Sequence, residues 1–154
     1  MSQICEFSVN KASAEQIASH LLCCDSDFVP LLSDRVVIND YAEKLEKYAT
    51  RFEAWSGSLL IGLVAIYCND EKTFLAHITS VSLLSTWRRC GIAQNLIRQC
   101  IQHAKIKNMK NINLSVGVSN YSAIDLYLKN GFSICSSDEF FAEMVVNIED
   151  GVNL

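Results

Sequence analysis

The amphipathic segment Gly91–Asn108 constrains the fold more than any other part of the chain. Its apolar residues recur every three or four positions, as in a helix that packs one side against a sheet. The segments on either side, Thr73–Leu84 and Asn111–Val118, alternate apolar and polar residues in the manner of strands. A strand, a helix and a second strand in this order predict two parallel strands joined by a crossover helix.

The rest of the chain adds hairpins and shorter helices to that unit. Further strands are predicted at Ile4–Val9, Phe52–Trp55, Ser58–Asn69, Phe132–Ser136 and Phe140–Ile148, and further helices after a Ser13 cap, at Asp40–Arg51 and at Ser122–Lys129 with a Ser122–Asp125 capping box. The order β-α-α-β-β-β-α-β-α-β-β indicates an α/β fold with a mixed, mostly antiparallel sheet flanked by helices. Because no linker or repeat interrupts the 154 residues, we expect residues 1–154 to form a single domain.

Charge and hydropathy argue against several classes of protein. The net charge is −4, from 13 basic and 17 acidic residues, whereas general nucleic-acid binding needs clustered Lys and Arg. No apolar run reaches the roughly 18 residues of a membrane span, and Met1–Glu6 lacks the pattern of a secretory signal. We therefore expect a cytoplasmic protein that binds neither nucleic acid nor membrane.

The seven cysteines give no sign of disulfides or of a metal site. Their number is odd, and their spacing contains no C-x-x-C and no Cys–His pair at zinc spacing. Free cysteines that behave as small core residues in a reducing compartment fit this pattern better. No metal is expected.

The segment Ile78–Ala93, ITSVSLLSTWRRCGIA, is the first sign of function. A strand runs into a loop with Arg88 and Arg89, and the long helix starts where the loop ends. The free amides of a helix N-terminus suit a pyrophosphate, and Gly91 allows the backbone to approach it closely. By itself, the R-x-x-G-x-A pattern also fits an ordinary helix start with solvated arginines.

A second pattern, NYSAIDLYLKNGF at Asn120–Phe132, follows the next strand. The crossover would bring it beside the first pattern, and the Asn120 amide could bridge backbone and ligand. Ala123 and Tyr127 are four residues apart on one face of a short helix, so the Tyr127 hydroxyl can point at the sheet opening. The alternative for Tyr127 is a packed core aromatic.

Together, these two patterns resemble the motifs of the GNAT superfamily of acetyl-CoA-dependent N-acetyltransferases. The matching residues are Arg88-x-x-Gly91-x-Ala93 and Asn120-x-x-Ala123-x-x-Leu126-Tyr127-x-x-x-Gly131-Phe132. The resemblance implies a V-shaped splay between the fourth and fifth strands, and transfer of acetyl from acetyl-CoA to a primary amine by direct attack in a ternary complex. The acceptor, a small molecule or a protein amine, stays open. Homodimers are common among such folds, which leaves a homodimer open here.

The resemblance also assigns roles by position. Backbone groups of Val81, Ser82 and Leu83 would pair with the pantetheine arm, and the Leu83 N–H would polarise the thioester carbonyl. Asn120 would hold the pantetheine arm, and Tyr127 would protonate the leaving thiolate. The pyrophosphate loop, which begins at Arg88, would contribute the amides of Arg89, Cys90, Gly91, Ile92, Ala93 and Gln94. We expect the electropositive loop to make Cys90 react faster with alkylating agents than Cys100 on the apolar stripe.

The acid role of Tyr127 has a thermodynamic condition. A phenol with a pKa near 10 gives its proton to a thiolate with a pKa near 8.5 at a cost of roughly 2 kcal/mol. The role therefore requires either a lowered Tyr127 pKa or proton transfer concerted with C–S cleavage.

A carboxylate base is missing where many relatives carry one. Those positions hold Thr79, Ser80 and Ser115, none of which takes a proton directly at neutral pH. His77, on the same strand face as Thr79, is the nearest titratable group, and Glu143 is a second candidate. The alternative for His77 is a strand histidine half-buried against a helix. The missing base leaves open a second function: a CoA-binding regulatory or interaction module with little turnover.

The acceptor side involves the irregular segment Phe28–Asn39, which carries Arg35. The resemblance places this segment, together with His77 and Thr79, beside the acceptor. Arg35 could then bind a carboxylate or phosphate of the acceptor. The alternative is a surface arginine that pairs with Asp34 or Asp40.

Overall fold

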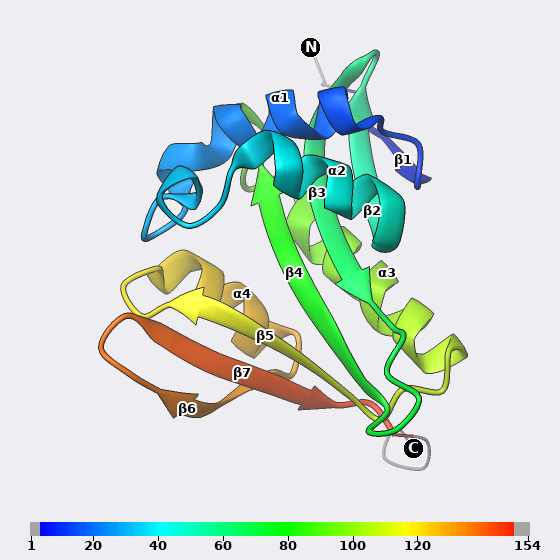
Figure 1. The fold of residues 1–154 in the computed structure, drawn as a ribbon, viewed down its shortest axis with the longest axis vertical. Coiled ribbons are helices and arrows are strands. Elements are labelled where there is room, and N and C mark those ends of the chain that lie inside the picture. Colours follow the sequence, from blue (N-terminus) through cyan, green and yellow to red (C-terminus); the bar gives the residue numbers. More distant parts are fainter. Residues whose placement is uncertain (1–3, 150–154) are drawn as a thin grey trace.

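The computed structural model describes residues 4–149, which form one seven-stranded sheet and four α-helices (Figure 1). The strands are β1 (Glu6–Val9), β2 (Thr50–Ser56), β3 (Leu59–Tyr67), β4 (Leu75–Leu83), β5 (Asn111–Gly117), β6 (Ser133–Ser137) and β7 (Phe141–Asn147). The helices are α1 (Ala14–Cys24), α2 (Ile38–Tyr48), α3 (Ile92–Ile106) and α4 (Tyr121–Lys129). The order of elements along the chain is the predicted one.

The sheet is mixed and mostly antiparallel, as expected. Its strand order is β1-β2-β3-β4-β5-β7-β6, and the described pairs are antiparallel except for β4 and β5. Helix α3 makes the crossover between these two parallel strands. The amphipathic segment therefore has the place in the topology that its sequence predicts.

Strands β4 and β5 are paired only at one end. The ladder joins Leu75–His77 to Asn111–Asn113, and beyond it the strands diverge into the V seen in Figure 1. On its other side, β4 stays paired with β3 as far as Leu83, with a register shift that leaves Thr79 as an extra residue. A β-bulge of this kind bends the strand and increases its twist. The splay expected between the fourth and fifth strands is confirmed.

Helices cover the two faces of the sheet unequally. Helices α1 and α2 pack on one face of β2 and β3, whereas α3 and α4 pack on the opposite face. Both layers are apolar: Ile17, Leu21, Leu45 and Leu63 lie in the first, and Leu96, Ile97, Ile112 and Met144 in the second. In the part of the chain that the structure describes, no helix covers the other face of β5, β7 and β6 (Figure 1). This uncovered half of the sheet lies beside the open V.

Two predicted helix boundaries are wrong. The segment expected as Asp40–Arg51 is a helix at Ile38–Tyr48, and Arg51 lies in β2 opposite Ala65. The last helix is capped by Asn120 rather than by the expected Ser122–Asp125 capping box. The Asn120 side chain accepts the N–H of Ala123 at 3.4 Å.

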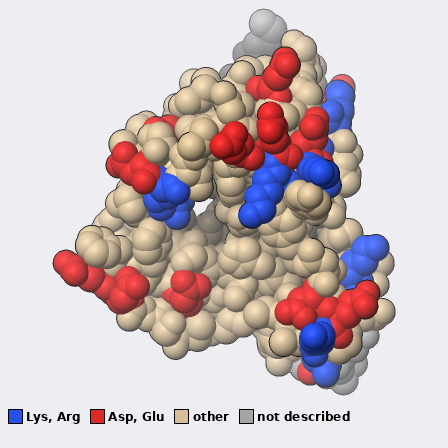
Figure 2. Space-filling model, in the orientation of Figure 1, with Lys and Arg blue, Asp and Glu red and all other residues tan. Residues whose placement is uncertain are grey.

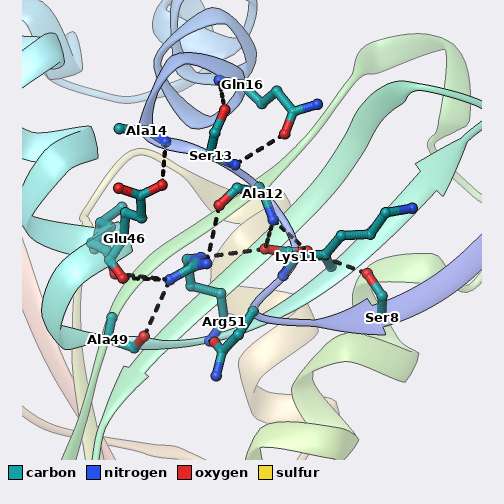
Figure 3. Close-up of polar contacts among 12 residues, drawn as sticks. Ser8, Lys11, Ala12, Ser13, Ala14, Gln16, Glu46, Ala49 and Arg51 are labelled. Atoms are coloured by element: carbon teal, nitrogen blue, oxygen red, sulfur yellow. Dashed lines mark hydrogen bonds and ion pairs between the residues drawn. The ribbon is translucent and has the colours of Figure 1, made fainter.

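The contacts of the Arg51 side chain explain why it lies in β2. Its buried guanidinium lies 3.3 Å from the Glu53 carboxylate and also donates to the carbonyls of Glu46 and Ala12 (Figure 3). Glu53 accepts in addition from the backbone N–H groups of Lys11 and Ala12. The pair therefore joins β2 to the end of α2 and to the turn before α1. The contacts with Lys11 and Ala12, about 40 residues away, have no local signature.

Candidate functional site

One edge of β4 faces the V without a strand partner. Past the last β4–β5 rung at His77, only the β3 side of β4 is paired. The Leu84 N–H donates to the Ile61 carbonyl of β3 at 2.8 Å. Because N–H groups alternate in direction along an extended strand, those of Val81 and Leu83 point the other way, into the V.

The bulge is held by a tyrosine that the sequence did not single out. The Tyr41 hydroxyl, from α2, donates to the Thr79 carbonyl at 2.8 Å and lies 3.0 Å from the Thr79 hydroxyl. Burial raises the pKa of Tyr41, and the hydrogen bond to Thr79 opposes that rise. Ser80 is buried, and its hydroxyl has no partner among the described residues. Thr79 and Ser80 thus both face α2, but only Thr79 forms a hydrogen bond with it.

Ser82 anchors β4 to α1. Its hydroxyl lies 2.8 Å from Nε2 of the buried His20, whose Nδ1 lies 2.9 Å from the Leu60 carbonyl. A carbonyl can only accept, so Nδ1 carries the proton and Nε2 accepts from the Ser82 hydroxyl. Burial lowers the pKa of His20, which favours this neutral form. The Ser82 side chain is therefore structural, and only its backbone remains for a ligand.

The loop before α3 leaves its amides free. Arg89 and Gly91 both have left-handed backbone conformations, with φ of 64° and 77°. Gly91 is the N-cap of α3 and provides no side-chain cap, whereas Ser13 and Asn120 cap α1 and α4. Among the described residues, no acceptor takes the N–H groups of Arg89–Gln94. Free amides at a helix N-terminus, preceded by such a turn, form an anion-binding concavity.

The side chains of this loop behave differently from its amides. Arg88 forms an ion pair with Asp27, which follows α1, at 2.6 Å, and both side chains are partly exposed. Such exposed pairs contribute little to stability, so an anionic ligand can compete for Arg88. Cys90 is exposed, whereas Cys100 is buried and its pKa is raised by that burial. This contrast in exposure fits the expected difference in reactivity, which stays a prediction.

Asn120 and Tyr127 are placed by α4 on the β5 side of the V. Tyr127 is buried in the core between the sheet and α3, with its ring 6.0 Å from that of Phe132. Burial raises the pKa of Tyr127, the opposite of the lowering that a stepwise proton transfer would need. Asn120 uses its side-chain oxygen as the cap of α4, which leaves its NH₂ group free to donate.

Polar side chains line the uncovered face of the sheet at the V. His77 Nδ1 lies 2.7 Å from Asn113 Oδ1, and both are on the last β4–β5 rung. The Ser115 hydroxyl donates to the Glu143 carboxylate at 2.5 Å across β5 and β7. The predicted half-burial of His77 against a helix is not observed, because this side chain is exposed.

Arg35 approaches the same face from the segment between α1 and α2. Its guanidinium lies 5.5 Å from the centre of the Phe141 ring on β7, and no described acidic side chain forms an ion pair with it. The alternative pairing with Asp34 or Asp40 is therefore not observed. Figure 2 shows this face hollowed between the part with α1 and α2 and the part with β5, β7 and β6.

The predicted residues therefore lie on two sides of one gap. The free loop amides and Tyr127 belong to the α3–α4 side of the sheet, whereas Arg35 and His77 belong to the uncovered side. The unpaired edge of β4 lies between them. A thioester held along this edge could be reached by a nucleophile from the uncovered face.

The structure also has a cavity outside this site. A cavity of about 520 Å³ lies between α1 and the β2–β3 hairpin and includes His20 and Leu84, but none of the predicted ligand residues. Among residues 4–149, no group of His, Cys, Asp and Glu side chains could hold a metal ion. None of the described helices is long and apolar enough to cross a membrane.

Comparisons with known proteins agree with this geometry. The family model described as "Acetyltransferase (GNAT) family" matches residues 14–132. The N-alpha-acetyltransferase of Saccharolobus solfataricus is 44% identical over 62 residues, covering 36% of this chain and 34% of that protein. The ribosomal-protein-S18-alanine N-acetyltransferase from Escherichia coli aligns with a TM-score of 0.75 over 98% of this chain and 99% of that one, at 15% identity.

A ligand-bound neighbour has the same fold. The PaiA N-acetyltransferase from Thermoplasma acidophilum, in complex with coenzyme A, aligns with a TM-score of 0.69 over 92% of this chain and 99% of that one, at 16% identity. At such identities the structural likeness shows the fold. The match with each of three curated relatives spans only 34% of that relative's length.

Proposed function

Because the chain belongs to the acetyltransferase (GNAT) family, we propose that it transfers acetyl from acetyl-CoA to a primary amine by direct attack in a ternary complex. One observation carries the proposal most strongly. The unpaired edge of β4 leads to the uncapped N-terminus of α3. The extended pantetheine arm could therefore bind along the edge while the pyrophosphate binds at the helix N-terminus.

The cofactor residues follow from that edge. The backbone of Val81, Ser82 and Leu83 would pair with the pantetheine arm, and Asn120 would donate to it from the β5 side. The amides of Arg89–Gln94, with the Arg88 guanidinium released from Asp27, would hold the pyrophosphate. A neighbour of the same fold solved with coenzyme A supports this assignment.

The transfer step uses two groups of this chain. The Leu83 N–H would stabilise the charge that develops on the thioester oxygen. Tyr127 would protonate the leaving sulfur. Since burial raises the pKa of Tyr127, stepwise transfer is costlier than for a free phenol, and the proton would move together with C–S cleavage.

The acceptor would bind on the uncovered face. His77, Thr79 and Arg35 border the region from which an amine could approach the β4 edge. Arg35 has no ion pair among the described residues, so its guanidinium can bind an anionic group of the acceptor. We therefore favour a primary amine that also carries a carboxylate or phosphate.

A second candidate function is a CoA-binding module with little turnover. It is favoured by Thr79 and Ser80, which face α2 and offer no proton acceptor. Release of CoA thiol from acetyl-CoA, measured across a panel of primary amines with and without an anionic group, separates the two functions. Amine-dependent release supports the transferase. Tight CoA binding without release across the panel supports the module.

A further inference from the structure

We propose that Glu143, held by the Ser115 hydroxyl, is the carboxylate that takes the proton from the acceptor amine as the new amide bond forms. The inference rests on the proposed function. It assigns the proton acceptor that Thr79, Ser80 and Ser115 cannot supply.

The contact between the two side chains fixes where the carboxylate lies. Ser115 on β5 and Glu143 on β7 are directly opposite in the antiparallel ladder. The Ser115 hydroxyl donates to Glu143 Oε1 at 2.5 Å. One carboxylate oxygen is thereby drawn over β5, toward the V, and away from the outer edge of the sheet.

The position of Ser115 places that carboxylate inside the V, just beyond its closed end. Asn113 is the last β5 residue paired with β4, and Ser115 is the next residue on the same face. That face is the uncovered one, on which His77 and Arg35 also lie. An amine that approaches the β4 edge from this side passes Glu143.

The carboxylate is also free to act. No described Lys, Arg or His side chain forms an ion pair with Glu143. The Arg35 guanidinium lies 5.5 Å from the centre of the Phe141 ring, and Phe141 is two residues from Glu143 along β7. Glu143 could therefore accept a hydrogen bond from the neutral amine while Arg35 holds an anionic group of the same acceptor.

The chemical step balances with groups that the chain provides. The neutral amine attacks, the N–C bond forms and the C–S bond breaks. One N–H proton goes to the Glu143 carboxylate, and the departing sulfur takes one proton from the Tyr127 hydroxyl. The products are the acetylated amine and CoA thiol; afterwards Glu143 loses a proton to solvent and Tyr127 regains one.

The rival for this role is His77. Asn113 holds its Nδ1, which leaves Nε2 as a free acceptor. Unlike Glu143, it lies on the last paired rung at the closed end of the V. A direct comparison of variants at the two positions separates them.

The test uses the full chain and the most active amine of the panel. Glu143→Gln keeps the size of the side chain and should lower kcat by about 10²–10⁴-fold, with the KM for acetyl-CoA unchanged. Glu139→Gln removes an equally charged, exposed side chain between β6 and β7 and should match the parent. Thermal melts with acetyl-CoA check that each variant folds and binds.

The decisive experiment moves the carboxylate from position 143 on β7 to the opposed position 115 on β5. Cβ atoms of opposed residues lie about 5 Å apart, so a carboxylate at position 115 can reach the place that Glu143 occupies. Ser115→Glu in the Glu143→Gln background should recover at least tenfold of the lost kcat. A role that needs the Ser115 hydroxyl as donor to residue 143 predicts no recovery, because the double variant lacks that hydroxyl and returns only a carboxylate.

The outcomes separate this inference from the proposed function. If the parent releases no CoA with any amine, the proposed function fails and the inference falls with it. If the parent turns over and Glu143→Gln matches Glu139→Gln, only the inference is overturned. A loss of kcat in His77→Gln that exceeds the loss in Glu143→Gln also overturns it, in favour of His77.

Discussion

His77 on β4 and Asn113 on β5 form the last rung that joins the two strands, with 2.7 Å between Nδ1 and Oδ1. Beyond this rung the strands separate, and the edge of β4 becomes available to a ligand. The pair therefore sets where the V begins.

Asn113→Ala should loosen the closed end of the V. Loss of this partly exposed hydrogen bond should lower the free energy of unfolding by about 1 kcal/mol. A wider V should also raise the KM for acetyl-CoA severalfold. Asn95→Ala is the matched control, because it removes an exposed 2.7 Å side-chain hydrogen bond to Gln99 on α3, outside the V. Equal KM values for the two variants would show that the rung does not set the V.

Gly117→Ala should disturb the segment between α1 and α2. A Cβ at this position would lie 2.1 Å from the Val29 carbonyl oxygen, so the backbone of that segment must move. We expect a loss of about 1–3 kcal/mol in urea unfolding and weaker acceptor binding, since Arg35 follows on the same segment. Gly57→Ala meets nothing within 4 Å and controls for glycine removal in a turn, with only the strain of its positive φ. An unchanged acceptor KM in Gly117→Ala would separate this segment from the acceptor.

Stability should fall with acidification because of His20. Burial lowers its pKa in the folded state, so below the unfolded pKa of about 6.5 the unfolded chain binds the proton first. The free energy of unfolding should therefore decrease from pH 7 downward, until the lower folded pKa is reached. The pKa of His103 is also lowered by burial, so His103 adds to the loss of stability over the same pH range. His20→Gln should be less stable at pH 7 and show a flatter pH dependence. An unchanged slope would contradict a buried, neutral His20 in the folded state.

The patterns that predicted the fold correctly are those that local sequence determines. The period of Gly91–Asn108 and its flanking strands predicts the crossover, and Gly91 with its neighbours predicts a helix start suited to an anion. The end of α2 was missed because Arg51 is held by Glu53 and by carbonyls from other elements.

The same limit applies to the site. Tyr41 and His20 reach β4 partners 38 and 62 residues away, and the Ser115–Glu143 contact depends on the register of β5 against β7. None of these pairings has a local signature. The sequence could therefore indicate the cofactor side of the V, where backbone and helix ends dominate, better than the acceptor side, where cross-strand side chains dominate.

Tyr127→Phe should separate catalysis from binding. No described residue hydrogen-bonds the Tyr127 hydroxyl, so its removal should leave the melting temperature and the KM for acetyl-CoA nearly unchanged. If this hydroxyl protonates the leaving sulfur, kcat should fall by about 10²–10⁴-fold. Turnover equal to that of the parent would make Tyr127 a packing residue.

Thermal unfolding with and without acetyl-CoA tests most directly whether the V and the uncapped end of α3 hold this ligand. Acetyl-CoA at a hundred times its Kd should stabilise the folded chain by about 2.7 kcal/mol. For a chain of this length, that corresponds to a rise in Tm of roughly 5–10 °C. A rise of this size is the predicted result, and a Tm unchanged by millimolar acetyl-CoA would contradict the account.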